Sequence, residues 1–149
     1  MKKERVYLGA DHAGFELKEN IKSYLSSKVQ VQDIGAHKYN KHDDYPKYAE
    51  KVAKLVSKDK GSKGILVCGS AQGMCITANK IKNVRAVTPN TQSEAKLTRQ
   101  HNNANVLCLS GWNLSTKEAF KIVDSWLKTD FSKEPRHNRR LKEIARLEK

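Results

Sequence analysis

The segment Cys68–Gly73 combines one thiol with several small residues, a combination that suits proton transfer next to an anion. Small residues let successive backbone N–H groups point into one concavity, and such a concavity at a helix start binds anions. A thiol in this position is expected to have a lowered pKa and to be partly thiolate at neutral pH. The alternative interpretation is an inert buried cysteine that closes a strand.

A second polar pair, Asp11 and His12, follows the first apolar run of the chain. An aspartate beside a histidine can orient the imidazole and tune its charge. Asp11 could equally cap the next helix, because aspartate accepts hydrogen bonds from the first free N–H groups of a helix. The sequence leaves both roles open.

Two segments nearer the C-terminus carry further histidines and arginines. His101 and Asn102 end a helical pattern, where the simpler interpretation is a polar helix C-terminus. Arg136 and Arg140 are four residues apart and share one face of a helix, with His137 beside them. Two guanidiniums on one face suit a phosphate, although a solvated basic tail would look the same.

The elements that must position these residues follow from hydrophobic patterning. Short β-rich runs alternate with segments of helical period, which is typical of a parallel α/β sheet. The runs ILVC and VLCL are continuously apolar, as expected for strands covered on both faces. The predicted strands span residues 5–9, 29–33, 64–68, 84–88 and 105–109.

Helical segments separate these strands and have recognisable starts. The pairs Thr91/Glu94 and Ser115/Glu118 have capping-box spacing. A last helix is predicted from about Asn138 to the C-terminus. Its apolar positions are few, and we expect a partner surface to bury them. Residues 1–149 are therefore predicted to form a single domain, a three-layer α/β/α sandwich with a five-stranded, mainly parallel Rossmann-like sheet. Ligands of such sheets bind beyond the carboxyl ends of the strands.

Composition narrows the class of protein. The net charge is +13, from 29 Lys+Arg against 16 Asp+Glu, which predicts attraction to anions. The basic residues are scattered and follow no nucleic-acid-binding motif, so we expect nucleic acid to be an unlikely partner. The other cysteines, Cys75 and Cys108, are interpreted as core residues, and neither a disulfide framework nor a zinc site is expected. We find no signal peptide or membrane span and expect a cytoplasmic protein.

Taken together, the motifs resemble the family of type B ribose-5-phosphate isomerases and galactose-6-phosphate isomerases over nearly the whole chain. Each motif is weak evidence alone, but their order and spacing in one chain are specific. The matching segments are Gly9–Phe15, Asp44–Pro46, Cys68–Gly73, Ala78–Lys80, Arg99–Asn102 and Arg136–His137.

The resemblance implies an aldose–ketose isomerase that converts ribose 5-phosphate to ribulose 5-phosphate through a cis-enediolate. It implies that Cys68 is the base and that Ser70 helps to open the ring or guides the proton. It also implies that His101 opens the furanose ring, and that Asp11 assists His101 or binds a sugar hydroxyl. No metal or organic cofactor is expected.

The resemblance also implies a binding surface that two copies of the chain share. The C-terminal arginines of one subunit would reach the site of its neighbour in a homodimer or homotetramer. The implied substrate-binding residues are His12, Tyr45, Gly69, Ala71, Gln72, Gly73, Asn102, Arg136, His137 and Arg140.

Three departures from the family pattern bear on the choice of sugar. Ala71 stands where glycine is common, Gln72 is bulkier than usual, and Trp112 stands where arginine is frequent. A six-carbon substrate, such as galactose 6-phosphate or allose 6-phosphate, is therefore the alternative to ribose 5-phosphate. A nucleic-acid-binding protein on the same fold is a third, less favoured hypothesis.

Overall fold

Five strands form one sheet in the order β2-β1-β3-β5-β4 in the computed structural model of the chain, which describes residues 3–148. All of the pairings are parallel, which confirms the predicted fold class. The strands are β1 (Arg5–Ala10), β2 (Gln30–Gly35), β3 (Lys63–Cys68), β4 (Ala86–Val87) and β5 (Val106–Ser110). Each predicted strand is present, although β4 keeps only the middle of the run predicted at 84–88.

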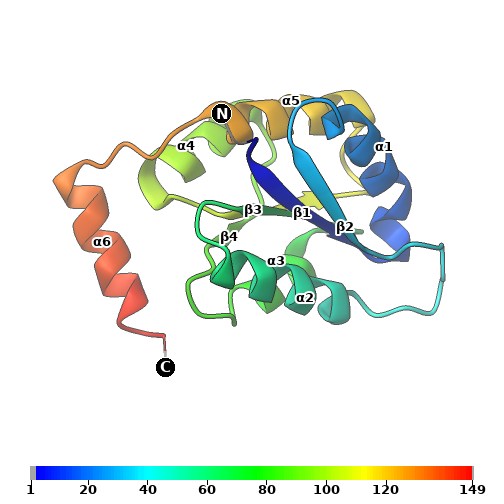
Figure 1. Cartoon of the computed structure of the whole chain (residues 1–149), viewed down its shortest axis with the longest axis horizontal. Helices are drawn as coiled ribbons and strands as arrows, with labels where there is room; N and C mark the ends of the chain where they lie inside the picture. Colours follow the sequence, from blue (N-terminus) through cyan, green and yellow to red (C-terminus); the bar gives the residue numbers. More distant parts are fainter. Residues whose placement is uncertain (1–2, 149) are drawn as a thin grey trace.

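Helices cover both faces of the sheet (Figure 1). One layer holds α1 (Phe15–Leu25), α4 (Gln92–Asn102) and α5 (Thr116–Lys128), and the other holds α2 (Tyr45–Lys58) and α3 (Gln72–Ala78). A short 3₁₀ turn, η1 (His12–Gly14), precedes α1, and α6 (Pro135–Ala145) stands apart on the side of α4 and β4. None of the helices described is both long and apolar enough to cross a membrane.

Alternation along the strands decides which layer each side chain meets. In β3, Ile65 and Val67 pack under α1 and α5, whereas Leu66 and Cys68 pack under α2 and α3. Both sets are buried, as the uninterrupted apolar run predicts for a strand covered on both faces. The alternation therefore turns the Cys68 thiol toward the α2 and α3 layer.

Two helix ends differ from the sequence-based prediction. Ser115 and Glu118 form the complete predicted capping box, but Glu94 accepts a hydrogen bond from the N–H of Asn90 and not from that of Thr91. The last helix begins at Pro135, before the predicted start at Asn138, because proline suits the first turn of a helix. It ends at Ala145 and does not continue to the C-terminus, whose last residue lies outside the described range.

The order of the strands places two loops side by side. The chain turns from β1 outward to β2, and then crosses back to β3 on the other side of β1. In an α/β sheet this reversal opens a crevice at the carboxyl ends of the strands, here called the carboxyl edge. Since Ala10 pairs with Val67, the next residues along each strand, Asp11 and Cys68, enter that crevice together.

A buried lysine ties α1 to the neighbouring edge of the sheet. Lys18 is fully buried, and its ammonium donates to both carboxylate oxygens of Asp33, at 3.1 and 3.0 Å. Burial alone would raise the pKa of Asp33, but hydrogen bonds from Lys18, the N–H of Gly35 and Lys22 hold it below its ordinary value. Because the folded pKa is depressed, this contribution to stability is present at neutral pH and is lost as the pH falls through that pKa.

Replacing Lys18 with methionine is expected to lower the free energy of unfolding by about 3–5 kcal/mol, because the buried carboxylate loses its main partner. The matched change Lys22→Met removes an exposed donor to the same carboxylate and is expected to cost about 1 kcal/mol or less. Urea unfolding at one fixed protein concentration measures both variants. Equal losses in the two variants would contradict this account.

Candidate active site

Cys68 ends β3 and is enclosed by the loop that follows it. Only 3% of the residue is exposed. The backbone N–H groups of Met74, Ala71 and Ser70 lie near its sulfur and act to lower the pKa of the thiol, and we call these three groups the amide nest. The N–H of Gly111 donates to the carbonyl of Cys68 at 2.8 Å, which attaches the loop to the end of β5. The loop predicted to bind an anion therefore directs its N–H groups at the thiol.

Ala71 turns the chain at the start of α3. Its φ is 71°, in the left-handed region that costs a non-glycine residue about 1 kcal/mol. The next residue, Gln72, is exposed and begins the helix. Alanine thus adopts here a conformation that favours glycine, and this turn sets the direction of the backbone that carries the amide nest.

The expectation that the Cys68 pKa would be lowered is wrong for this chain. Burial raises the pKa of the thiol, and the carboxylate of Asp11 raises it further. The three N–H groups of the amide nest act in the opposite direction but do not offset the loss of water. The thiol therefore stays protonated at neutral pH in the single chain, although groups that stabilise a thiolate surround it.

Asp11 caps the turn that follows it, which is one of the two roles that the sequence left open. Its Oδ1 accepts a hydrogen bond from the N–H of Gly14 at 3.1 Å, so it caps the turn η1. It is also 4% exposed and lies close enough to Cys68 to affect the charge of the thiol. Burial raises the pKa of Asp11 itself.

His12 lies beside Asp11 and contacts a residue that no motif indicated. Its ring Nδ1 is 2.7 Å from Oδ1 of Asp43, and its backbone N–H donates to the same oxygen at 3.0 Å. Donor atoms of Asp11, His12 and Asp43 lie within 4.8 Å of one another. Because Asp43 already accepts from His12 and Asp11 from Gly14, these oxygens serve as acceptors within the protein, and we assign no metal to them.

Two aromatic rings form walls against the amide nest. The Tyr45 ring touches Gly73 so closely that a Cβ on that glycine would lie 2.3 Å from Cζ of the tyrosine. The Trp112 ring lies against Gly69 in the same way, at 2.5 Å, while 73% of the tryptophan stays exposed. Glycine at both positions therefore lets the rings approach the loop backbone.

Other predicted residues lie elsewhere in the chain. His101 and Asn102 are at the C-terminal end of α4, and a helix that starts above the carboxyl edge ends at the opposite, amino edge. The carbonyl of Asn102 accepts from Arg85 Nε at 3.0 Å, just before β4 begins. The six residues of β3 separate the two edges by about 17 Å. One chain therefore does not bring His101 or Asn102 to Cys68.

The C-terminal histidine and arginines belong to the same distant region. His137 is buried, its ring lies 4.5 Å from that of His101, and its Nδ1 is 2.7 Å from Oγ of Ser132. Burial lowers the pKa of His137. Arg136 and Arg140 lie on the exposed surface of α6 with the predicted four-residue spacing.

The remaining cysteines are less alike than the sequence suggested. Cys108 is buried as predicted, and burial raises its pKa well above the ordinary value. Cys75 is only half-buried and packs against the core under α2 and α3, so it is less enclosed than predicted. A hydrogen bond with Cys108 lowers the pKa of Cys75, and the Cys75 thiol donates to the carbonyl of Ala86 at 3.3 Å.

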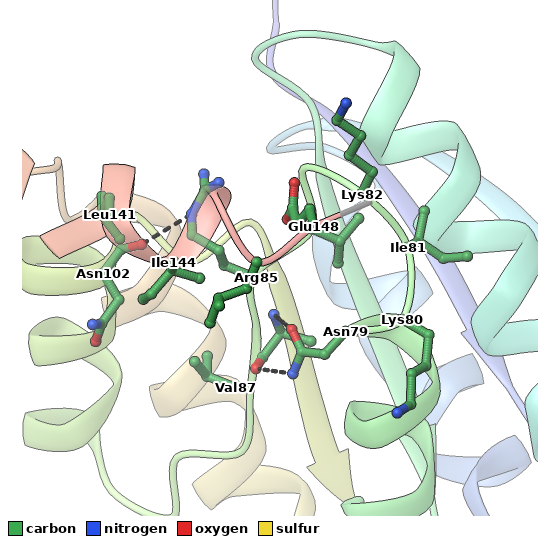
Figure 2. Close-up of a pocket in the computed structure, with 13 residues that line it drawn as sticks. Asn79, Lys80, Ile81, Lys82, Arg85, Val87, Asn102, Leu141, Ile144 and Glu148 are labelled. Atoms are coloured by element: carbon green, nitrogen blue, oxygen red, sulfur yellow. Dashed lines mark hydrogen bonds between the residues drawn. The ribbon is translucent and has the colours of Figure 1, made fainter.

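A groove of about 670 Å³ lies between α6 and the segment around β4 (Figure 2). Leu141 and Ile144 line it from α6, and Val87 and Arg85 line it from the other side. The exposed fractions of Ile144 and Leu147 are 46% and 80%. The sparse apolar face predicted for the last helix is therefore only partly covered within the chain.

Comparison with known proteins agrees with this geometry. Residues 6–144 match the Ribose/Galactose Isomerase family. The chain belongs to the ribose/galactose isomerase family. A probable ribose-5-phosphate isomerase B from Mycoplasma genitalium is 42% identical over 146 residues, which cover 97% of this chain and 95% of the relative.

One further relative and one solved structure extend the comparison. Ribose-5-phosphate isomerase B from Mycobacterium tuberculosis is 40% identical over 146 residues, covering 97% of this chain and 90% of the relative. The crystal structure of the Mycoplasma genitalium enzyme, which holds ribulose-5-phosphate, has a TM-score of 0.94 and 40% sequence identity. That comparison covers 98% of this chain and 97% of the other.

The sequence did not indicate two residues of this site, Asp43 and Tyr48. Asp43 lies 31 residues after His12, in the segment between β2 and α2. Tyr48 lies in the first turns of α2, and its hydroxyl donates to Asp43 Oδ2 at 3.2 Å. Their neighbours Asp44 and Tyr45 belong to a segment that matches the family. That match was the one feature of the sequence that pointed to this part of the site.

Alkylation of Cys68 by iodoacetamide is expected to follow a pKa above the ordinary thiol value of about 8.5, because burial and Asp11 both disfavour the thiolate. Peptide mass spectrometry across a pH series measures the rate. The variant Asp11→Asn keeps an oxygen acceptor for Gly14 but loses the charge, so its profile is expected to move to lower pH. A wild-type profile at or below the ordinary value would contradict this account.

Proposed function

We propose that this protein interconverts D-ribose 5-phosphate and D-ribulose 5-phosphate, as an aldose–ketose isomerase. The observation that carries the proposal is the Cys68 thiol inside the amide nest, beside Asp11 and His12, at the crevice between β1 and β3. Family membership supports it, as does the similar structure from Mycoplasma genitalium, which holds ribulose-5-phosphate.

In the proposed reaction the Cys68 thiol first loses its proton to solvent, and the resulting thiolate removes the proton on C2 of the open-chain aldose. The electrons of the C2–H bond form the C1–C2 double bond, and the C1 carbonyl oxygen becomes an oxyanion. The oxygen on C2 then loses its proton to the oxygen on C1 and becomes the carbonyl, while Cys68 returns its proton to C1. Hydrogen is moved within one molecule, so the sugar has no net gain or loss of electrons and no redox partner is needed.

The loop after β3 supplies the electrostatic part of this mechanism. N–H donors fixed in a site that excludes water stabilise an oxyanion as it develops, without reorganisation. The amide nest and the backbone of Gly69 and Gly73 would offer such donors, and the N–H of Gln72, which donates to Ser70 Oγ at 3.4 Å, would hold that hydroxyl beside them. Ser70 is exposed at the mouth of the loop and would assist ring opening or guide the proton. Tyr45 would lie over the substrate.

We propose that a second copy of the chain completes the site. Within one chain, the ring-opening residue His101 and the sugar-binding Asn102 lie at the amino edge, a strand length away from Cys68. A homodimer, alone or as half of a homotetramer, could present these residues across an interface. The half-exposed groove between α6 and β4 is a surface that such an interface would bury.

The phosphate would be held by groups from both copies. His12 would bind it from the chain that supplies Cys68, and Arg136 and Arg140 would reach it from the other chain. Their spacing puts both guanidiniums on one face of α6, with His137 at the base of the helix. Fixed guanidiniums bind phosphate with paired hydrogen bonds.

A cytoplasmic location remains a prediction from the sequence.

A coupled isomerase assay with EDTA present is expected to detect turnover of ribose 5-phosphate. Replacing Cys68 with alanine should lower kcat by about 10²–10⁴-fold, the usual contribution of a positioned acid–base group. The matched control Cys108→Ala removes a buried thiol from the adjacent strand and should keep kcat within about tenfold of wild type.

Near-normal turnover by the Cys68→Ala variant would contradict the assignment of the base. Allose 6-phosphate and galactose 6-phosphate, assayed in parallel, should show lower kcat/KM than ribose 5-phosphate. Activity on a six-carbon phosphate alone would keep the mechanism and contradict the substrate, and Trp112 and Gln72 would then be the first positions to change.

A further inference from the structure

The loop before α2 holds His12 by a single carboxylate. Oδ1 of Asp43 accepts the backbone N–H of His12 at 3.0 Å and contacts ring Nδ1 at 2.7 Å. Oδ2 of Asp43 accepts the Tyr48 hydroxyl at 3.2 Å. Although it lies in a loop, the Asp43 side chain is only 7% exposed. Both of its oxygens therefore have partners, and the partners come from two separate segments of the chain.

This arrangement fixes how the imidazole of His12 is presented. Hydrogen bonds from the backbone and the ring of one residue to one oxygen leave the ring little freedom to rotate. The other ring nitrogen, Nε2, lies across the ring from Asp43 and has no hydrogen-bond partner among residues 3–148. The His12 side chain is 32% exposed, and its ring centroid lies 6.3 Å from that of Tyr39, with the two rings nearly perpendicular. A donor at Nε2 is thus available to a ligand.

The charged groups around His12 all favour its protonated form. The hydrogen bond with Asp43 raises the pKa of His12 most, and the charges of Asp11, Asp43 and Asp44 raise it further, against a smaller opposing effect of burial. Tyr48, which is bonded to Asp43, has a raised pKa because of burial and the nearby carboxylate. His12 therefore keeps its charge at pH values at which an ordinary histidine is neutral, and it loses that charge as the pH rises through its own pKa.

We infer that Asp43 is a positioning residue that holds His12 as a fixed cation for the phosphate of the substrate, with Tyr48 fixing Asp43 in turn. This inference rests on the proposed function, which makes His12 a phosphate ligand. Asp43 acts through His12 and does not touch the sugar. The start of α2 also supplies Tyr45, whose ring packs against Gly73 in the loop that carries the amide nest.

The test is the variant Asp43→Asn, which keeps an oxygen acceptor of the same shape but has no charge. Two-dimensional NMR with labelled histidine follows the titration of His12, assigned with a His12→Asn variant. The pKa of His12 is expected to fall by about one unit or more, as for loss of a directly paired carboxylate. At about pH 8, KM for ribose 5-phosphate should rise about tenfold with kcat within about threefold of wild type, because a charge-assisted phosphate contact is lost.

Two matched variants separate the direct contact from general effects. Asp44→Asn removes a neighbouring charge whose side chain makes no capping bond, and it should shift the His12 pKa much less than Asp43→Asn. In a His12→Asn background, adding Asp43→Asn should leave KM unchanged, since the two residues act as one unit. A further rise in KM there would show that Asp43 acts on the fold and not through His12, and would overturn the inference.

The outcomes keep the inference distinct from the proposed function. If the wild-type protein does not isomerise ribose 5-phosphate, the proposed function fails, but the His12 titration and the affinity for inorganic phosphate still test Asp43. An unchanged His12 titration in Asp43→Asn would overturn the inference even in an active enzyme. If Asp43→Asn does not fold, Tyr48→Phe is measured in its place: Asp43 then loses one of its two anchors, so KM should rise with kcat little changed, and an unchanged KM would overturn the inference.

Discussion

The parallel pairing of β1 with β3 is the contact on which the candidate site depends. It joins two strands that are separated in the chain by β2 and α2, and its register brings Asp11 and Cys68 to one crevice. The pairing of β3 with β5 then sets Ser110 beside Cys68, and the Ser110 hydroxyl donates to the carbonyl of Gly69. A slip of one residue in either pairing would turn Cys68 to the opposite face of the sheet.

Within this crevice, two physical effects oppose each other at one atom. Packing under α2 and α3 removes water from the Cys68 sulfur, which favours the thiol, whereas the amide nest favours the thiolate. A buried thiol among N–H donors is protonated in the resting protein, and the donors stabilise the thiolate once the proton has left. The same donors suit an enediolate oxygen, so the site is arranged for charge that develops during the reaction.

Much of the fold and part of the site could be predicted from the sequence. Continuous apolar runs predicted the buried strands, the Ser115 motif predicted the start of α5, and the small residues after Cys68 predicted the amide nest. The raised pKa of Cys68 could not be predicted, because it depends on packing by residues far along the chain. Asp43 was missed for the same reason, since nothing local connects it with His12.

The separation of Cys68 from His101 by the strand topology makes the central claim testable, namely that two copies build one site. The most direct measurement mixes Cys68→Ala chains with His101→Ala chains by co-expression. If the site is shared, each heterodimer holds one complete site, and about a quarter of the wild-type isomerase activity should return. If each chain works alone, every site lacks one residue, and no activity above that of the two separate variants would return.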